Sequence, residues 1–484
     1  MDFESLDALR FHTNMSVDSV MTTAADVAWA IDYHYESYGL GSDYMDQLVD
    51  SSPLVPEFES AADESSEIED NIVVKLINKV IVDAHHQGAS DIHIEPYKDG
   101  KKTIIRFRKD GTLIPYFELP GHYRNALVSR IKIMAGLDIS ERRKPQDGKI
   151  DYRKYGSLDI ELRVATMPTV GRIEDIVIRV LSSGKPVPVN ELDLSERNHD
   201  KIRKAIAKPY GLFLVCGPTG SGKTTTLHSI LGDLNTDARK IWTVEDPVEI
   251  TQEGLRQVQV NPRIGLTFAA AMRSFLRADP DVIMVGEMRD QETLAIGVEA
   301  SLTGHLVLST LHTNSAPDSI VRLLDMGMDP FNFADALLGI LAQRLAKRLC
   351  LECREEHIAS EDEIQALLRE YRKEVKQCQN SQLSAEAVMS EWHSKFADRD
   401  GRYTLYKAVG CDTCDRTGYK GRIGIHEFLD ATDVVKRCIL EGQTVSELLA
   451  AGLEGDMRTL KQDGIEKVLQ GYTDMVQVRI VCIK

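Results

Sequence analysis

The segment Gly217–Thr224, GPTGSGKT, constrains what this chain can fold into more than any other part of the sequence. An apolar run, LFLVC, precedes it, and the helical stretch TTLHSILGDL follows it. Glycines at these positions let backbone N–H groups turn inward around a phosphate, and the first turn of the helix adds its dipole. A buried strand, a glycine loop and a helix in this order predict a nucleotide-binding core with a mostly parallel sheet.

Two side chains of this loop have expected roles in binding ATP. We expect Lys223 to bring a positive charge to the β- and γ-phosphates, and the Thr224 hydroxyl to ligate Mg²⁺. The whole predicted nucleotide site of this segment consists of Gly217, Pro218, Thr219, Gly220, Ser221, Gly222, Lys223, Thr224 and Thr225.

Hydrolysis of ATP also needs an acid near the metal and a group that orients water. The run DVIMVGEMRD predicts a second strand, with Gly286 where P-loop enzymes usually carry Asp, so Glu287 is the residue expected to polarise water. A further strand ends in TVEDPVE, which contains three carboxylates: Glu245, Asp246 and Glu249. They either hold Mg²⁺ through water or share the role of base, because ligands dock at this edge of a nucleotide-binding sheet.

Two histidines, His305 and His312, flank the predicted strand in TGHLVLSTLHTN. A lone histidine is usually structural. Two on a strand emerging beside a P-loop favour sensing of the γ-phosphate.

Two pairs of cysteines have metal-binding spacing. Cys350 and Cys353 form one C-x₂-C pair, and Cys411 and Cys414 form a second after residues 354–410. Four thiolates complete a tetrahedral zinc site with no open position, so the predicted zinc is structural. The alternative is a set of reduced surface thiols.

Apolar periodicity predicts an α/β protein: a P-loop (RecA-like) ATPase core with an α+β N-terminal lobe, a four-cysteine zinc module and a small helical C-terminal region. In the N-terminal lobe we expect helices at 71–87 and 124–138 and strands at 90–96, 103–114, 149–154, 158–167 and 175–181. The predicted boundaries are an acidic, partly flexible segment 1–70, the N-terminal lobe 71–183, a linker 184–200, the ATPase core 201–345, the zinc module 346–425 and the C-terminal region 426–484.

Charge is concentrated at one end of the chain. The formal net charge is −17, and residues 1–70 hold seventeen acidic residues against one basic residue, Arg10. We expect residues 51–70 to be a solvated linker. Net acidity disfavours binding to nucleic acid, although the near-neutral remainder weakens that argument. No run of about 18 apolar residues occurs, and the acidic start does not resemble a secretory signal, so we expect a cytoplasmic protein.

The four blocks GPTGSGKT, TVEDPVE, DVIMVGEMRD and GHLVLSTLHTN, in this order, resemble the secretion ATPases that power type II secretion and type IV pilus assembly. The resemblance extends over about residues 71–484 through ASDIHIEP, the segments 129–150 and 159–169, and MRTLKQDGIEKVLQGYT. It implies a hexameric ring with ATP bound between two lobes of each subunit. It also implies that arginines reach the phosphates: Arg163 and Arg179 from the N-terminal lobe, with Arg277 and Arg289 from the core. Guanidinium groups can stabilise the negative charge that is distributed over the oxygens of a phosphoryl group during transfer.

The same resemblance implies a cytoplasmic motor that couples ATP hydrolysis to assembly of pilin or pseudopilin subunits through an inner-membrane platform protein. Alternatives are the ATPase of a conjugative or DNA-uptake pilus, a DNA translocase, and a nucleotide-dependent adaptor with little turnover. The acid excess of residues 1–70 motivates a further expectation, that this segment docks on the cytoplasmic domain of an inner-membrane recruiting protein.

Overall fold

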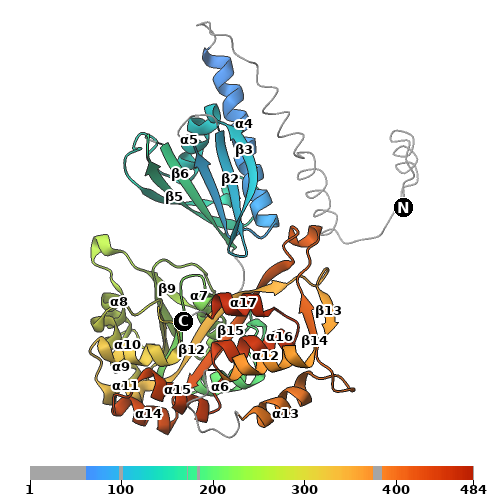
Figure 1. Cartoon of the computed structure of the whole chain (residues 1–484). Helices are drawn as coiled ribbons and strands as arrows, with labels where there is room; N and C mark the ends of the chain where they lie inside the picture. Colours follow the sequence, from blue (N-terminus) through green and yellow to red (C-terminus); the bar gives the residue numbers. More distant parts are fainter. Residues whose placement is uncertain (1–61, 98–101, 172, 183–185, 374–383, 483–484) are drawn as a thin grey trace, which may run out of the picture. The chain divides into compact units, whose positions relative to one another are not determined.

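The computed structural model describes residues 62–97, 102–171, 173–182, 186–373 and 384–482 (Figure 1). The chain divides into two compact units between Ser182 and Ser183. Each unit has its own hydrophobic core, the first drawn from residues 73–178 and the second from residues 189–478. None of the described helices combines the length and the hydropathy that a membrane span requires.

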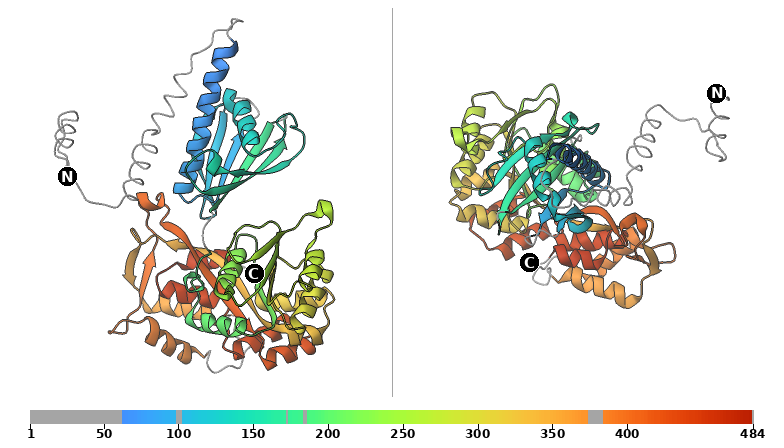
Figure 2. Two further views of the ribbon diagram at one scale, coloured as in Figure 1. Left: turned by 180° about the vertical axis from the view of Figure 1, so that it is seen from behind. Right: turned by 90° about the horizontal axis from the view of Figure 1, so that it is seen from above.

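The N-terminal unit is a six-stranded antiparallel sheet of order β3-β2-β1-β6-β5-β4, with its helices on one side (Figure 2). Side chains alternate along each strand, so that Ile92 and Ile94 enter the core while His93 does not. The predicted α+β lobe is confirmed by α4 (Ala62–His86), β1 (Asp91–Pro96), β2 (Lys102–Lys109), β3 (Thr112–Pro120), α5 (Arg124–Met134), β4 (Gln146–Asp151), β5 (Ile160–Thr169) and β6 (Ile173–Ser182).

Helix α4 begins earlier than the sequence pattern predicted. The expected solvated linker covered residues 51–70, whereas helix α4 already includes residues 62–70. The stretch contains Ala and Glu, which have high helix propensity. Residues 1–61, to which the rest of the acidic segment belongs, lie outside the described residues.

The second unit is built on a seven-stranded sheet of order β15-β12-β7-β11-β10-β8-β9, in which only the β12–β15 pair is antiparallel. Its strands are β7 (Gly211–Cys216), β8 (Ile241–Glu245), β9 (Arg256–Gln259), β10 (Val282–Val285), β11 (Leu306–Leu311), β12 (Leu337–Leu349) and β15 (Tyr419–Asp430). A separate two-stranded ribbon pairs β13 (Glu355–Ile358) with β14 (Thr404–Lys407).

Helices cover both faces of this sheet, as an almost fully parallel sheet requires. One face packs against α6 (Glu196–Ile206) and α7 (Lys223–Leu234). The core on the other side of the sheet includes residues of α8 (Phe268–Phe275), α9 (Gln291–Leu302), α10 (Ala316–Asp325), α11 (Pro330–Ala336), α12 (Glu361–Arg372), α13 (Ala385–Phe396), α14 (Asp433–Leu440), α15 (Val445–Glu454), α16 (Leu460–Leu469) and α17 (Met475–Val481).

The core sheet extends beyond the predicted ATPase core of residues 201–345. Strand β12 runs on to Leu349, and β15 joins the same sheet, although residues from 426 onward were expected to form only helices. Leu, Ala and Arg make up most of β12 and favour helix in isolation, but burial between two neighbouring strands overrides that preference. After Asp430 the expected small helices follow.

Candidate functional site

Four neighbouring parallel strands end at one edge of the core sheet. Because β7, β11, β10 and β8 run in the same direction, the segments that follow them share this edge. They are the P-loop after β7, His312 after β11, Glu287 after β10 and Asp246 after β8. Four motifs from separate segments of the sequence therefore lie next to one another.

The P-loop residues adopt the backbone conformations that glycine permits. Gly220 and Gly222 have φ of 79° and 87°, in the left-handed region. The buried Lys223 Nζ donates hydrogen bonds to the carbonyls of Gly217 and Pro218, at 2.8 and 3.1 Å. The ammonium group is thus folded into the concave side of its own loop, and Thr224 and Thr225 follow it half-buried in the first turn of α7.

Burial sets the protonation of the groups under the loop. Burial lowers the pKa of Lys223, against the opposing effects of Cys216 and Glu287. Burial raises the pKa of the Cys216 thiol to about 11, so this cysteine is neutral at physiological pH. The loop is therefore lined by one strongly desolvated cation, which a bound phosphate would stabilise. This donor set fits a nucleotide phosphate.

Gln343 of β12 supports the P-loop from behind and was not identified from the sequence. Its Nε2 donates to the Ser221 carbonyl at 2.8 Å, and its Oε1 accepts from Thr226 Oγ1 at 2.7 Å. A Cβ on Gly222 would lie 2.8 Å from Gln343 Nε2, so the glycine lets the amide approach the loop. The signal that could have found Gln343 is a polar residue directly after the apolar run LLGILA in a core strand.

Glu287 stands at the centre of a charged group beyond the tip of β10. Arg289 Nη2 lies 2.5 Å from Glu287 Oε1, and His312 Nε2 lies 3.4 Å from Oε2. The Thr310 hydroxyl donates to the Gly286 carbonyl at 2.6 Å and so holds the turn before Glu287. The Glu287 side chain is 11% exposed, whereas that of Arg289 is 70% exposed. A buried carboxylate with an exposed cationic partner suits a residue that accepts or donates protons near a phosphate.

The three carboxylates of TVEDPVE differ in their surroundings. Glu245 is buried and accepts hydrogen bonds from Thr243 Oγ1 at 2.7 Å and Gln257 Nε2 at 3.1 Å, and its other oxygen lies 3.1 Å from His228 Nε2. Asp246 is exposed and Glu249 is half-buried. Glu245 thus ties α7 to the tips of β8 and β9, while Asp246 and Glu249 keep more access to solvent.

Two predicted site residues lie at the other edge of the sheet. His305 precedes β11, and its Nδ1 contacts the Ala300 carbonyl at 3.0 Å. The structure therefore does not bring His305 together with His312 and the P-loop, because the length of β11 separates the two histidines. Arg277 is exposed in the loop that leads into β10, also at the edge where the parallel strands begin.

Arg163 and Arg179 belong to the N-terminal unit. They face each other in register on β5 and β6. The Arg179 side chain is 56% exposed, and its Nε donates to Asp91 Oδ1 at 3.1 Å.

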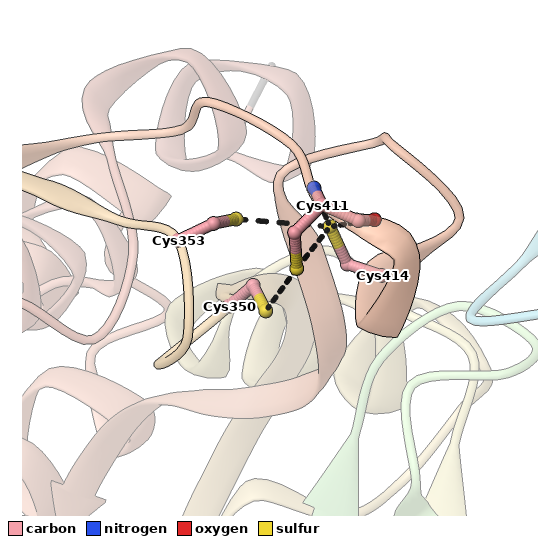
Figure 3. A group of neighbouring side chains, drawn as sticks. All are labelled: Cys350, Cys353, Cys411 and Cys414. Atoms are coloured by element: carbon pink, nitrogen blue, oxygen red, sulfur yellow. Dashed lines mark hydrogen bonds between the residues drawn. The ribbon is translucent and has the colours of Figure 1, made fainter.

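The four predicted metal ligands lie together at the ends of two paired strands. Cys350 directly follows β12, and Cys414 ends a short 3₁₀ helix, Asp412–Cys414, that precedes β15. Figure 3 shows the four side chains converging, and their sulfur atoms all lie within 4.8 Å of one another. The Cys350–Cys411 and Cys353–Cys414 sulfur distances are 3.9 and 3.7 Å. The cluster can hold a metal ion.

Backbone N–H groups point at the sulfurs, as they do where thiolates are stabilised. Gly410 donates to Cys353 Sγ at 3.3 Å, and Gly418 donates to Cys414 Sγ at 3.2 Å. Burial opposes ionisation of Cys414, but backbone N–H groups and neighbouring thiols lower its pKa to about 6. Partial burial and the other thiols raise the pKa of Cys353 to about 12. A cation among the four sulfurs would favour the thiolate form of all four cysteines. The donors therefore fit a thiolate-bound metal.

A parallel sheet with a P-loop at its carboxyl edge, an acid on an adjacent strand and a separate antiparallel N-terminal sheet define a P-loop ATPase with a RecA-like core. The chain matches the family described as Type II/IV secretion system protein over residues 66–480, and it belongs to that family of ATPases.

Named relatives include both branches of this family. The chain is 40% identical over 481 residues to the "Type IV pilus assembly ATPase PilB" of Myxococcus xanthus, covering 98% of this chain and 79% of that protein. It is 40% identical over 444 residues to the "Type II secretion system ATPase E" of Vibrio cholerae, covering 92% and 80%. The X-ray structure of the Legionella pneumophila ATPase DotB has the same fold, with a TM-score of 0.58, 21% identity and coverage of 84% and 95%.

Proposed function

We propose that this protein is a cytoplasmic motor that binds ATP with Mg²⁺ at the P-loop and uses hydrolysis to drive assembly of pilin or pseudopilin subunits at the inner membrane. The observation that carries the enzymatic part is the position of Glu287, on the strand tip beside the P-loop and within reach of Arg289 and His312. Relatives named for pilus assembly and for type II secretion are equally similar to the chain, which supports the shared activity of both systems.

Each residue of the site has a defined task in this proposal. Lys223 leaves the loop carbonyls to meet the phosphates, and Thr224 ligates the Mg²⁺, which offsets phosphate charge. Arg289 leaves Glu287 for a phosphate oxygen, and the freed carboxylate orients the attacking water and accepts its proton. Asp246 and Glu249 hold water around the metal, and His312 senses the phosphate beside Glu287.

The remaining parts of the proposal follow from the family resemblance. Six copies form a ring in which ATP is bound between lobes, and Arg163 and Arg179 supply further positive charge to the phosphates. The tetracysteine cluster binds structural zinc, because four thiolates leave no open coordination position. The moving ring acts on an inner-membrane platform protein, and residues 1–70 dock on a recruiting protein.

Replacement of Glu287 by Gln tests the motor mechanism. The amide keeps the size of the side chain but cannot accept a proton, so phosphate release should fall by roughly 100-fold or more, the range for loss of a general base. Binding of ATP should persist, because Lys223 and the loop are unchanged. Phosphate release at steady state and binding of a fluorescent ATP analogue measure the two quantities.

Glu299→Gln is the matched control, since Glu299 is an exposed glutamate on α9. It should hydrolyse ATP at the rate of the unmodified protein. Equal rates for Glu287→Gln and the unmodified protein would refute the mechanism and favour an adaptor with little turnover. In the same assay, added DNA should leave the rate unchanged, whereas salt-sensitive stimulation by DNA would support a DNA translocase instead.

A further inference from the structure

A cavity of about 300 Å³ lies on the face of the core sheet opposite α7. Its floor is formed by Arg344 of β12 and Glu427 of β15, and its walls come from α10, α15, α16 and the end of α17 (Figure 1). All of these elements belong to the second unit. The volume is at the lower limit for small-molecule sites, roughly 300–1,000 Å³, so the cavity suits a molecule smaller than a nucleotide.

Arg344 points away from the P-loop, although its neighbour Gln343 supports that loop. Successive residues of a strand project to opposite faces of the sheet. Ala342 belongs to the core on the cavity side, whereas Leu341 belongs to the core that includes residues of α7. Gln343 therefore reaches α7, while Arg344 lines the cavity.

The guanidinium group of Arg344 is buried and hydrogen-bonded to uncharged oxygens. The residue is only 7% exposed. Its Nη1 donates to the Gln343 carbonyl at 3.0 Å, and its Nη2 donates to the Asn314 carbonyl at 2.8 Å. These hydrogen bonds satisfy donors but do not neutralise the charge. Because a buried cation costs less free energy when an anion contacts it, this group favours an anionic ligand.

The two carboxylates that line the cavity already accept hydrogen bonds from the protein. Glu427 accepts from the N–H groups of Ala316 and Leu460, at 2.8 and 3.3 Å, where α10 and α16 begin. Asp318 accepts from the Ser315 hydroxyl at 2.6 Å. The half-buried Lys461 adds a second positive charge to the lining. An incoming ligand therefore gains most from contact with the cations.

Apolar side chains form much of the remaining wall. Val445 and Leu449 lie one turn apart on α15, and Leu460 and Val481 complete the lining from α16 and α17. Val445, Leu449 and Val481 are half-buried, so they retain apolar surface that a ligand could cover. A molecule with one charged group and an apolar body matches this combination.

We infer that this cavity binds a small organic anion, a carboxylate with an apolar body, and that Arg344 receives the carboxylate. Arginine and carboxylate groups match in bidentate geometry, which fixes the orientation of the bound molecule. Its apolar body lies against Val445 and Leu449.

The bound anion is expected to weaken the binding of ATP from behind the P-loop. The Gln343 carbonyl, which accepts from Arg344, lies close to Gly217, since a Cβ on that glycine would be 2.6 Å from this oxygen. The Asn314 carbonyl, which also accepts from Arg344, follows shortly after His312. An anion that draws the guanidinium toward itself loosens both contacts. The affinity for ATP should therefore fall about fivefold, within the usual range of allosteric coupling. This step rests on the proposed function, because it takes ATP as the ligand of the P-loop.

Octanoate, a carboxylate with an unbranched apolar chain, is the probe. Calorimetric titration of the full-length protein should detect binding of octanoate and none of 1-octanol, which has the same chain without the charge. Arg344→Gln should weaken octanoate binding roughly tenfold or more, the effect of losing a charge-assisted hydrogen bond.

Leu449→Trp tests the cavity while Arg344 stays in place. The larger side chain fills the space beside α15, so octanoate should again bind at least roughly tenfold more weakly. Leu440→Trp is the matched control, because Leu440 is an exposed leucine of α14 outside the lining and should leave the binding unchanged. Melting temperatures close to that of the unmodified protein show that both tryptophan variants fold.

Three results would overturn the site: no heat with octanoate and the unmodified protein, equal binding by Leu449→Trp, or equal binding of 1-octanol. Saturating octanoate should weaken binding of a fluorescent ATP analogue about fivefold, and an unchanged affinity would refute the coupling to the P-loop. If Glu287→Gln hydrolyses ATP as fast as the unmodified protein while octanoate binding still depends on Arg344 and Leu449, the proposed mechanism fails and the anion site stands.

Discussion

At the scale of single residues, the sequence motifs identify which residues lie at the site, but they do not show what each residue contacts. Lys223 and Glu287 lie at the sheet edge that the motif order predicted. The motif TVEDPVE, however, contains three carboxylates that the sequence does not distinguish. Only the fold shows that Glu245 is hydrogen-bonded to His228 and two other side chains. Such hydrogen bonds join residues that are far apart in the sequence, so a local sequence pattern cannot predict them.

Gln343 is the second residue that local patterns do not identify. Replacing it with Leu should leave the Ser221 carbonyl and the Thr226 hydroxyl without their partner, and the loop would lose its preferred shape. We expect the Kd for ATP to rise roughly tenfold, since loss of buried hydrogen bonds costs about 1–3 kcal/mol. Titration with a fluorescent ATP analogue measures the change.

Gln462→Leu provides the comparison for this prediction. Gln462 is also buried, but it accepts from the Thr459 N–H and donates to the Tyr371 carbonyl, at 2.9 and 3.2 Å. Both variants should lose stability, whereas only Gln343→Leu should lose affinity. Equal affinities of the two variants for ATP would show that Gln343 stabilises the fold and does not determine the conformation of the P-loop.

At the scale of elements, the antiparallel pair β12–β15 connects motifs that the sequence separates. The pair places Leu349 opposite Tyr419, so each C-x₂-C pair lies beside the end of one strand. Cysteine spacing alone predicted the cluster, but the strands that position it were not expected. Strand β12 contains a single β-branched residue, Ile340, and its long-range pairing decides its conformation.

His426 in β15 should make stability depend on pH. The ring is completely buried, and neither ring nitrogen has a hydrogen-bond partner among the described residues. Burial, with a smaller effect of Lys467, lowers its pKa well below 6.5. Below pH 6.5 the unfolded chain therefore binds a proton that the folded chain does not, and the folded state loses up to about 1.4 kcal/mol per pH unit.

His426→Met should remove this contribution. Urea unfolding above and below pH 6.5 should show a smaller loss of stability on acidification for the variant than for the unmodified protein. His393→Met, at an exposed position of α13, should keep the original pH dependence. The same pH dependence in all three proteins would contradict the prediction.

At the scale of the whole molecule, the two units have separate cores, and all four predicted metal ligands belong to the second unit. Calorimetry should therefore resolve two transitions. A strong chelator should lower the transition of residues 183–484 by more than about 5 °C, since metal binding contributes directly to folding stability, and should leave that of the N-terminal unit in place.

Cys411→Ser should reproduce the effect of the chelator and lose the bound metal. Cys438→Ser changes a buried cysteine of α14 outside the cluster and should keep the metal content. Unchanged metal content and thermal stability in Cys411→Ser would contradict a structural metal site. Binding of ATP should survive in both variants.

The position of β15 has a consequence for synthesis of the chain on the ribosome. Strands β7 to β12 are complete once Leu349 has emerged, but the strand that covers the free edge of β12 begins only at Tyr419. While residues 350–418 are translated, an apolar edge next to the P-loop strand has no partner, and unpaired edges invite association between chains. The same event that closes this edge brings Cys411 and Cys414 to Cys350 and Cys353. A nascent chain thus gains its finished nucleotide-binding sheet and its four-cysteine cluster together, late in translation.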